Sequence, residues 1–212
     1  MKNEKIAILI QCHSEPKRLQ RLVENFNRDE FDVFIHVDKK STMDLKTQLK
    51  PYKNIYILED EKRVDVRWGT VSQVEASLNL LIEASSHESY DHYLLLSGSC
   101  YPIKRMEDLI SLLSSSKNLN YINLSKSMNY QSSYNYFDKR NDIYYPSFML
   151  NRTKWGDFSR KVWLVLTGWR SKTFKLFKRS VPGDMNSYFG SSWWYFNEEF
   201  VRYILRFLNL NP

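Results

Sequence analysis

Three short polar segments follow apolar runs in the amino-acid sequence, and each carries side chains able to bind a ligand. Residues 11–14 (QCHS) end the apolar run that begins at Lys5, Asp38 follows DVFIHV, and residues 97–102 (SGSCYP) follow DHYLLL. Such runs are typical of buried parallel strands, and an open α/β sheet binds its ligands beyond the carboxyl ends of these strands. We therefore expect the three segments to share one edge of a sheet.

Asp38 is the residue whose chemistry fits a ligand site best. A carboxylate at a strand end can accept hydrogen bonds from a ribose hydroxyl or a base, and the alternative is an aspartate that only caps a helix or closes a turn. His13 is a candidate base, although histidines in turns are more commonly satisfied by the backbone. His36, between Ile35 and Val37, fits a structural role.

Several common sites are missing from the sequence. It contains no G-x-G-x-x-G, G-K-[ST], C-x-x-C or H-x-x-x-H pattern, and residues 97–99 lack the G-x-S-x-G frame of a nucleophile elbow. His87 and His92 flank a helix–strand junction with no second ligand at metal spacing. Metal-dependent sugar-nucleotide enzymes usually present two aspartates after a central strand, where this chain has SGSC. We therefore expect no metal site and no cofactor.

The apolar spacing predicts the elements that position these segments. The expected strands are residues 5–11, 32–37, 54–58, 91–96, 121–124 and 193–196. A helix capped by Ser14 with Pro16 in its first turn should follow the first strand, Thr70 should cap another helix, and further helices are expected around 45–49, over 106–113 and over 200–208. In the helix after Thr70 the expected apolar stripe is Val71, Val74, Leu78, Leu81 and Ile82. This alternation predicts an α/β fold with a mostly parallel sheet.

Composition narrows the class of protein further. The chain has 212 residues, 42% of them hydrophobic, two cysteines and a net charge of +7, which fits one globular domain in a reducing, cytoplasmic compartment. The apolar run Ile6–Ile10 is too short for a signal peptide or a membrane span. Residues 125–187 show no clean period and fit a long functional loop.

A basic, aromatic strip lies within that aperiodic region. Between Arg152 and Arg179 there are nine basic residues and one acid, interleaved with tryptophan and phenylalanine. Such a strip could bind nucleic acid, an anionic membrane surface or substrate phosphates, and the alternative is a solvated basic face. No nucleic-acid reader motif accompanies it, so we expect no nucleic-acid partner.

Five sequence segments resemble one family. VRWG at 66–69 before a helix, YDHYLLLSGSCYPI at 90–103 and GSSWW at 190–194 followed by EFV, together with ILIQCH at 8–13 and IHVD at 35–38, resemble the core-2/I-branching β-1,6-N-acetylglucosaminyltransferases and their peptide xylosyltransferase relatives. The match favours a bacterial-type member without a membrane anchor. The resemblance implies a GT-A-like, Rossmann-type glycosyltransferase domain, with residues 1–124 as the nucleotide-binding half and 125–212 as the acceptor-side half.

The resemblance also implies an activity and a set of site residues. The activity is inverting, metal-independent transfer of N-acetylglucosamine or a related sugar from a UDP-sugar to a glycan or lipid-linked acceptor, with a peripheral position on the inner face of an anionic membrane. Asp38 would hold the uridine beside the turn after Gln11. The residues expected to line the donor cleft are Gln11, Cys12, His13, Asp38, Trp68, Gly69, Gly98, Ser99, Cys100, Tyr101, Pro102, Gly190, Ser191, Trp193 and Trp194. If 193 and 194 lie on a strand, only one of the two indoles should face a sugar.

Two departures from the family pattern affect these expectations. Cys100 stands where the family commonly has an aspartate before Tyr-Pro, and a thiol cannot make that carboxylate's hydrogen bonds. The family's general base, a glutamate in an Asp-Glu pair, falls beyond Pro212, and Glu198 and Glu199 come too early to replace it. The chain is then a truncated enzyme, which we favour, or a degenerate member that binds a sugar nucleotide or glycan without catalysis. A xylosyltransferase-like use of UDP-xylose is a further alternative.

Overall fold

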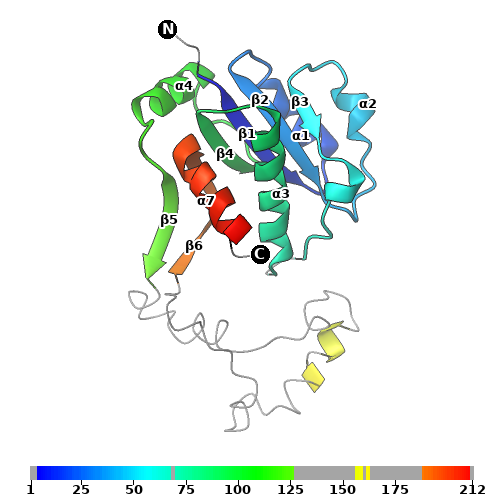
Figure 1. The fold of residues 1–212 in the computed structure, drawn as a ribbon. Helices are drawn as coiled ribbons and strands as arrows, with labels where there is room; N and C mark the ends of the chain where they lie inside the picture. Colours follow the sequence, from blue (N-terminus) through cyan, green and yellow to red (C-terminus); the bar gives the residue numbers. More distant parts are fainter. Residues whose placement is uncertain (1–3, 68–69, 127–155, 160, 163–187, 211–212) are drawn as a thin grey trace. The chain divides into compact units, whose positions relative to one another are not determined.

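The computed structural model describes residues 4–67, 70–126, 156–159, 161–162 and 188–210. Its regular elements alternate between strands and helices from the first strand onward (Figure 1). In chain order they are β1 (Ile6–Cys12), α1 (Pro16–Glu24), β2 (Phe31–Val37), α2 (Leu45–Leu49), β3 (Ile55–Ile57), a 3₁₀ turn (Asp60–Lys62), α3 (Ser72–His87), β4 (His92–Ser97), α4 (Met106–Ser115), β5 (Tyr121–Lys126), β6 (Tyr188–Asn197) and α7 (Glu198–Leu210).

The strands form one six-stranded sheet in the order β3-β2-β1-β4-β6-β5. Strand β1 pairs in parallel with β2 and with β4, β2 pairs in parallel with β3, and β6 runs antiparallel to β4. Because β1, β2 and β4 are parallel, their carboxyl ends meet at the same edge. The predicted α/β class and mostly parallel sheet are confirmed.

The chain divides into two compact units. The first comprises residues 1–66, 70–122 and 192–212, and the second comprises residues 67–69 and 123–191. The first unit holds the sheet core and all of the numbered helices. In the second unit, a Cβ at Gly190 would lie 2.7 Å from the Asn123 carbonyl oxygen, so the two chain segments approach closely there.

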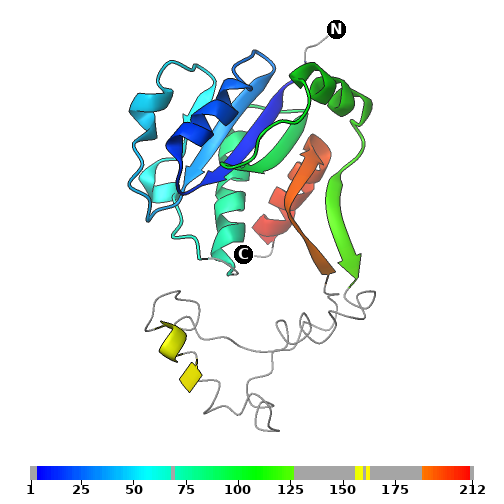
Figure 2. The ribbon, with the colours of Figure 1, turned by 180° about the vertical axis from the view of Figure 1, so that it is seen from behind.

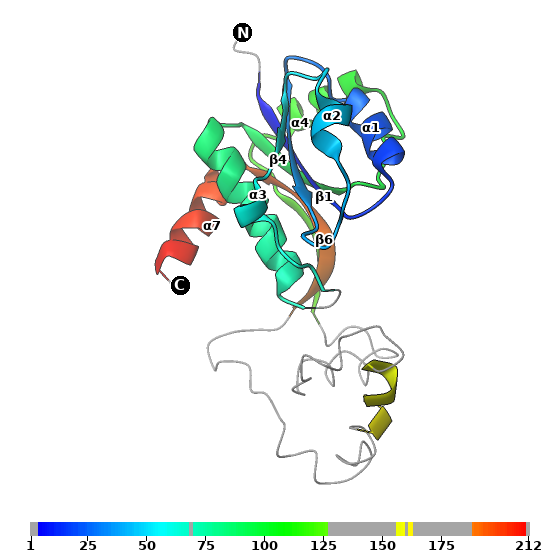
Figure 3. The ribbon, with the colours of Figure 1, turned by 90° about the vertical axis from the view of Figure 1, so that its right-hand side faces the viewer.

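Helices cover both faces of the sheet in the first unit (Figure 3). Seen from behind, α1 and α2 lie in front of the sheet and α7 lies beyond it (Figure 2). One face carries Ile6, Ile8, Ile10, Val33 and Ile35, which pack with buried side chains of α1, α2 and α4. The other face carries Ala7, Leu9, Phe34 and Leu95, which pack with α3 and α7. Strands β1 and β2 are thus buried on both faces, which accounts for their continuous apolar sequences.

The buried face of α3 differs from the stripe that the sequence predicted. Val71, Val74 and Ile82 are 67%, 55% and 50% exposed. The buried residues of the helix are instead Ala76, Leu80, Leu81 and Ala84. Residues 76, 80 and 84 are spaced by four and share one face, and two alanines allow the helix to lie close against the sheet. The predicted buried stripe, which followed the largest apolar side chains, is therefore wrong at three of its five positions. Leu81 is buried as predicted, and Leu78 is half-buried.

Two predicted helix caps also need correction. The residue before α1 is Glu15, in the left-handed conformation at φ 61°, with no capping bond from a side chain, so Ser14 is not the N-cap. Pro16 begins the helix as expected. Helix α3 begins at Ser72 after Val71, and the Thr70 hydroxyl accepts a hydrogen bond from the Ser72 amide at 3.2 Å.

None of the helices in the described part of the chain has the length and apolar character needed to cross a membrane.

Candidate functional site

The end of β1 joins two of the three polar segments to one another. The Asp38 amide donates a hydrogen bond to the Cys12 carbonyl at 2.8 Å, and the Gly98 amide donates one to the Gln11 carbonyl at 2.8 Å. Asp38 therefore flanks the end of β1 on one side, and Gly98 flanks it on the other. The three segments converge at the carboxyl edge of the sheet, as the sequence predicted from the strand pattern.

Asp38 is buried, with 7% of its surface exposed. Its Oδ1 accepts a hydrogen bond from the Lys40 amide at 2.9 Å, and its Oδ2 lies 3.4 Å from Lys40 Nζ. Hydrogen bonding to Asp65, together with the charge of Asp38, raises the pKa of Lys40. The Lys40 side chain therefore stays protonated beside the Asp38 carboxylate. Oδ1 therefore performs the turn role that the sequence left open, while Oδ2 lies beside the Lys40 ammonium.

Arg63 holds the backbone around Asp38 in place. Its guanidinium donates to the carbonyls of Val37 at 2.9 Å, Asp38 at 2.9 Å and Ser41 at 3.1 Å. It also forms a 2.7 Å ion pair with Asp60. One planar group with several donors thus fixes the chain on both sides of the carboxylate.

The side chain of His36, on β2, binds the backbone of the loop that also carries Arg63. The side chain is 1% exposed, and its Nε2 accepts a hydrogen bond from the Val64 amide at 2.9 Å. Burial lowers the pKa of His36, which favours the neutral imidazole that this bond requires. The structural role expected for His36 is the one it has, and that role positions the residues next to Asp38.

The side chains of the QCHS segment have different surroundings. Gln11 donates its amide to the Gln73 carbonyl at 3.2 Å and to Ser77 Oγ at 2.7 Å, so it ties β1 to α3. Cys12 is 6% exposed, and burial raises the pKa of its thiol to about 12. His13 is exposed at the edge. Within this segment His13 and Ser14 are the exposed residues.

The SGSCYP segment forms a tight turn after β4. The Ser97 hydroxyl lies 2.8 Å from that of Ser99 and accepts from the Ser99 amide at 3.2 Å, and the Cys100 amide donates to the Ser97 carbonyl at 2.9 Å. Tyr101 is 62% exposed, Pro102 and Cys100 are half-buried, and Cys100 packs against the core beside α4. The turn therefore offers hydroxyls and a phenol at the same edge as Asp38.

Gly98 and Gly190 lie where neighbouring parts of the chain leave no room for a side chain. A Cβ at Gly98 would lie 2.7 Å from the Cβ of Cys12, and a Cβ at Gly190 would lie 2.7 Å from the Asn123 carbonyl oxygen. Both positions are crowded by the protein's own neighbouring strands. Their lack of a side chain is explained by strand packing alone.

The two tryptophans of GSSWW separate as strand geometry requires. Trp194 stacks on Phe196 with ring centroids 4.2 Å apart and packs into the core, whereas Trp193 is 41% exposed. Because β6 is antiparallel to β4, moving back from Tyr195 to Trp193 moves toward the carboxyl edge of the sheet. Trp193 is therefore the more exposed of the two indoles and lies on the side of the carboxyl edge. Ser191 and Gly190 are exposed and belong to the second unit.

Some predicted features fall outside the described residues. These are Trp68 and Gly69, almost all of the basic strip at 152–179 and almost all of the aperiodic region at 125–187. The early glutamates are described, and they lie away from Asp38. Glu198 begins α7, donates its amide to the Asp91 carbonyl just before β4 and pairs with Arg202, so it belongs to the amino edge of the parallel strands.

Sequence reasoning missed the loop at 59–66 that supports Asp38. Arg63 and Val64 follow no recognisable motif, and their contacts join a side chain to a backbone group 22 to 28 residues away. The one available signal was His36, a polar side chain within an otherwise apolar strand, which must find a hydrogen-bond partner when buried.

Comparison with known proteins agrees with this architecture. An open α/β sheet with polar turns gathered at its carboxyl edge has the architecture in which α/β proteins commonly bind a ligand. The chain matches the Core-2/I-Branching enzyme family over residues 6–211, and it belongs to that family of glycosyltransferases. Family and sheet together confirm the GT-A-like fold expected from the motifs.

One curated relative shows how much of a longer protein this similarity covers. The chain is 23% identical to Xylosyltransferase 1 of Rattus norvegicus over 206 residues. The match takes in 94% of this chain and 22% of the relative, so the chain spans about a fifth of that protein's length.

Proposed function

We propose that this chain binds a UDP-sugar at the carboxyl edge of its sheet and transfers the sugar, N-acetylglucosamine or a related one, to a glycan or lipid-linked hydroxyl with inversion. The observation that supports this most is the pair of hydrogen bonds that fixes Asp38 and Gly98 on either side of the end of β1. Family membership supports glycosyl transfer as the chemistry.

Asp38 is the proposed uridine anchor. Its Oδ1 is used by the Lys40 amide, so Oδ2 is the oxygen that would accept from a ribose hydroxyl or a base N–H. The three carbonyl contacts of Arg63 would keep this oxygen from moving away. The hydroxyls of Ser97 and Ser99 would lie beside the diphosphate, and the exposed Trp193 would lie toward the sugar.

The proposed reaction is a direct displacement at the anomeric carbon. It requires a base that removes the proton of the acceptor hydroxyl and positive charge that stabilises the departing diphosphate. We propose that neither function is served by a divalent cation in the donor cleft. Glu198 at the amino edge of β4 is remote from Asp38 and does not serve as the base.

Calorimetric titration of the full chain with UDP, UDP-N-acetylglucosamine, UDP-xylose and single-stranded RNA tests this proposal. We expect the uridine ligands to bind and the RNA not to bind, with affinities that stay within twofold when EDTA is added. A tenfold loss of UDP affinity with EDTA would contradict metal independence. Binding of RNA in place of UDP would overturn the assignment.

Turnover separates an enzyme from a binding module. UDP release is measured from UDP-N-acetylglucosamine with a panel of glycan and glycolipid acceptors, followed by mass spectrometry of the products. Acceptor-dependent UDP release together with product formation supports transfer. UDP binding without release for any acceptor supports the alternative, a module that holds a sugar nucleotide without catalysis.

The basic strip supports a second proposal, peripheral contact with an anionic membrane. Nine cations between 152 and 179 exceed what one diphosphate requires. Vesicles with anionic lipid should bind the chain at low salt and release it near physiological salt. Replacing Lys172, Lys175 and Lys178 by serine should abolish vesicle binding and leave UDP affinity unchanged. Loss of UDP affinity would assign the strip to the donor site instead.

A further inference from the structure

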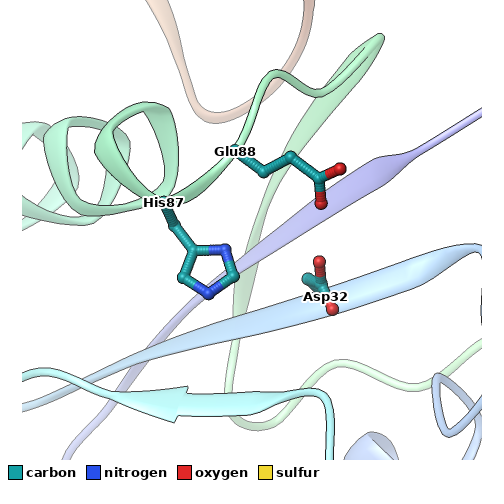
Figure 4. A group of neighbouring side chains, drawn as sticks. All are labelled: Asp32, His87 and Glu88. Carbon is teal, nitrogen blue, oxygen red and sulfur yellow. The ribbon is translucent and has the colours of Figure 1, made fainter.

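A second cluster of polar side chains lies at the other end of the parallel strands. Asp32 is near the start of β2, His87 is the last residue of α3, and Glu88 follows it (Figure 4). Asp32 and Asp38 are separated by six residues of extended chain, roughly 20 Å. The cluster is therefore remote from the proposed donor site, and neither site contributes residues to the other.

The three side chains converge on a common point. Figure 4 shows the carboxylates of Asp32 and Glu88 and the imidazole of His87 turned toward one another. One ligand atom from each residue lies within 4.8 Å of the others. The ligands of a tetrahedral zinc ion are roughly 3.3–3.6 Å apart, from metal–ligand distances of about 2.0–2.2 Å. Glu88 is exposed, so a rotation of its side chain would bring its carboxylate closer to Asp32 and His87.

The carboxylate of Asp32 is buried, and one of its two oxygens accepts no hydrogen bond from the described residues. The residue is 6% exposed, and its Oδ2 accepts a hydrogen bond from Tyr90 at 2.8 Å. Its Oδ1 accepts none within the described part of the chain. The same Tyr90 hydroxyl lies 3.1 Å from His87 Nδ1. Tyr90 thus fixes the orientation of two of the three side chains, as outer hydrogen bonds do at metal sites.

The negative charges of Asp32 and Glu88 are not paired with a cationic side chain of the described residues. Among the described residues, no lysine or arginine forms an ion pair with Asp32 or Glu88. The C-terminal end of the sixteen-residue α3 adds the negative end of a helix dipole. A bound cation would offset this accumulation.

Aromatic packing limits the motion of the imidazole. The ring of His87 lies 4.2 Å from that of Tyr56 and 5.7 Å from that of Phe34, measured between centroids. Both rings belong to strands of the sheet. An exposed histidine held in this way loses less conformational freedom on binding an ion than a free one does.

We propose that Asp32, His87 and Glu88 bind a divalent transition-metal ion of the zinc type. One imidazole nitrogen and two carboxylate oxygens suit zinc and its neighbours, whereas calcium and magnesium prefer oxygen ligands alone. The ion joins the end of α3 to the start of β2 and so stabilises the folded chain. Residue spacing does not predict this site, because His87 has no ligand at metal spacing and the fold supplies Asp32 from 55 residues earlier in the chain.

Zinc titration of the full chain tests the proposal, with calcium and magnesium titrated in parallel. The wild type should bind one Zn²⁺ at this site, and zinc should raise its midpoint of thermal unfolding. His87→Ala and Glu88→Gln change exposed side chains and should each weaken zinc binding at least tenfold and remove the thermal shift. Glu75→Gln, which changes another exposed acid on α3, should keep both.

The outcomes distinguish this site from the donor site. UDP affinity should be the same in all these variants, so a failure here leaves the proposed glycosyltransferase function untouched. Zinc affinity unchanged in His87→Ala and Glu88→Gln would overturn the proposal. Equal binding of calcium or magnesium would show a general acidic surface and would overturn it as well.

Discussion

Gly98 packs directly against Cys12, and a Cβ at position 98 would lie 2.7 Å from the Cβ of Cys12. That neighbour is the root of a side chain on a buried strand, so it cannot rotate away. The contact explains why the turn after β4 begins with glycine. It also fixes the spacing between this turn and the end of β1.

Gly98→Ala should lower the free energy of unfolding by about 1–3 kcal/mol, because it overpacks a rigid contact. Chemical denaturation monitored by tryptophan fluorescence measures the loss. The double variant Gly98→Ala with Cys12→Gly removes the opposing Cβ and should recover more stability than the two single changes would predict by addition. Strict additivity would show that the contact is not the cause.

Arg63→Lys should weaken UDP binding several-fold, because an ammonium cannot hold three carbonyls at once. Stability should also fall by about 1–3 kcal/mol as carbonyl partners are lost. Calorimetry with UDP and denaturation of the same samples separate the two effects. Asp60→Ala removes only the exposed ion-pair partner of Arg63 and should leave UDP affinity near wild type. If both variants lose affinity equally, the carbonyl contacts do not position Asp38.

His36 should make stability and UDP affinity depend on pH. Burial lowers its pKa below the ordinary value of 6.5, so the unfolded chain takes up a proton first as pH falls. The stability that His36 contributes is present above pH 6.5 and should be lost progressively below it, as protonation of Nε2 breaks the bond from Val64.

Unfolding free energies measured from pH 8 to pH 5 test this dependence. His36→Gln should flatten the profile, because glutamine does not titrate. His13→Gln, a change to an exposed histidine, should keep the wild-type profile. Parallel profiles for the wild type and His36→Gln would assign the pH dependence to other groups.

The two cysteines should differ widely in reactivity. Burial raises the pKa of Cys12 to about 12, so roughly one molecule in ten thousand carries its thiolate at pH 8. Cys100 is only half-buried. Timed alkylation followed by peptide mass spectrometry should show Cys100 modified first, and UDP should slow that modification. Equal rates for the two thiols, or no effect of UDP on Cys100, would place the turn outside the site.

The strands and their order of appearance were predictable because burial on both faces leaves a direct signature. Residues 32–37 and 91–96 differ by one residue from the observed β2 and β4. The buried face of α3 was not predictable from hydrophobicity alone, because Ala76 and Ala84 carry little apolar surface and yet are fully buried. Only the shape of the sheet decides which face of such a helix fits.

The positions of Asp38 and the SGSCYP turn were predictable from the sequence, whereas the contacts that support them were not. Strand ends place Asp38 and the SGSCYP turn together, since parallel strands share an edge. The supporting contacts of Arg63 and His36 link side chains to backbone groups, which leave no residue pattern. Gln11 was expected at the ligand, whereas its amide binds α3. The Asp32 cluster likewise depends on contacts between distant segments that spacing cannot reveal.

UDP affinity of Asp38→Asn, measured by calorimetry, tests the central claim most directly. Asparagine keeps an oxygen for the Lys40 amide and so preserves the turn, but it replaces Oδ2 by an amide that cannot accept from uridine. The account predicts a folded variant of near wild-type stability that binds UDP roughly 5- to 150-fold more weakly, equivalent to about 1–3 kcal/mol. Asp29→Asn, which changes an exposed aspartate between α1 and β2, should bind UDP as the wild type does. Unchanged UDP affinity in folded Asp38→Asn would contradict the account.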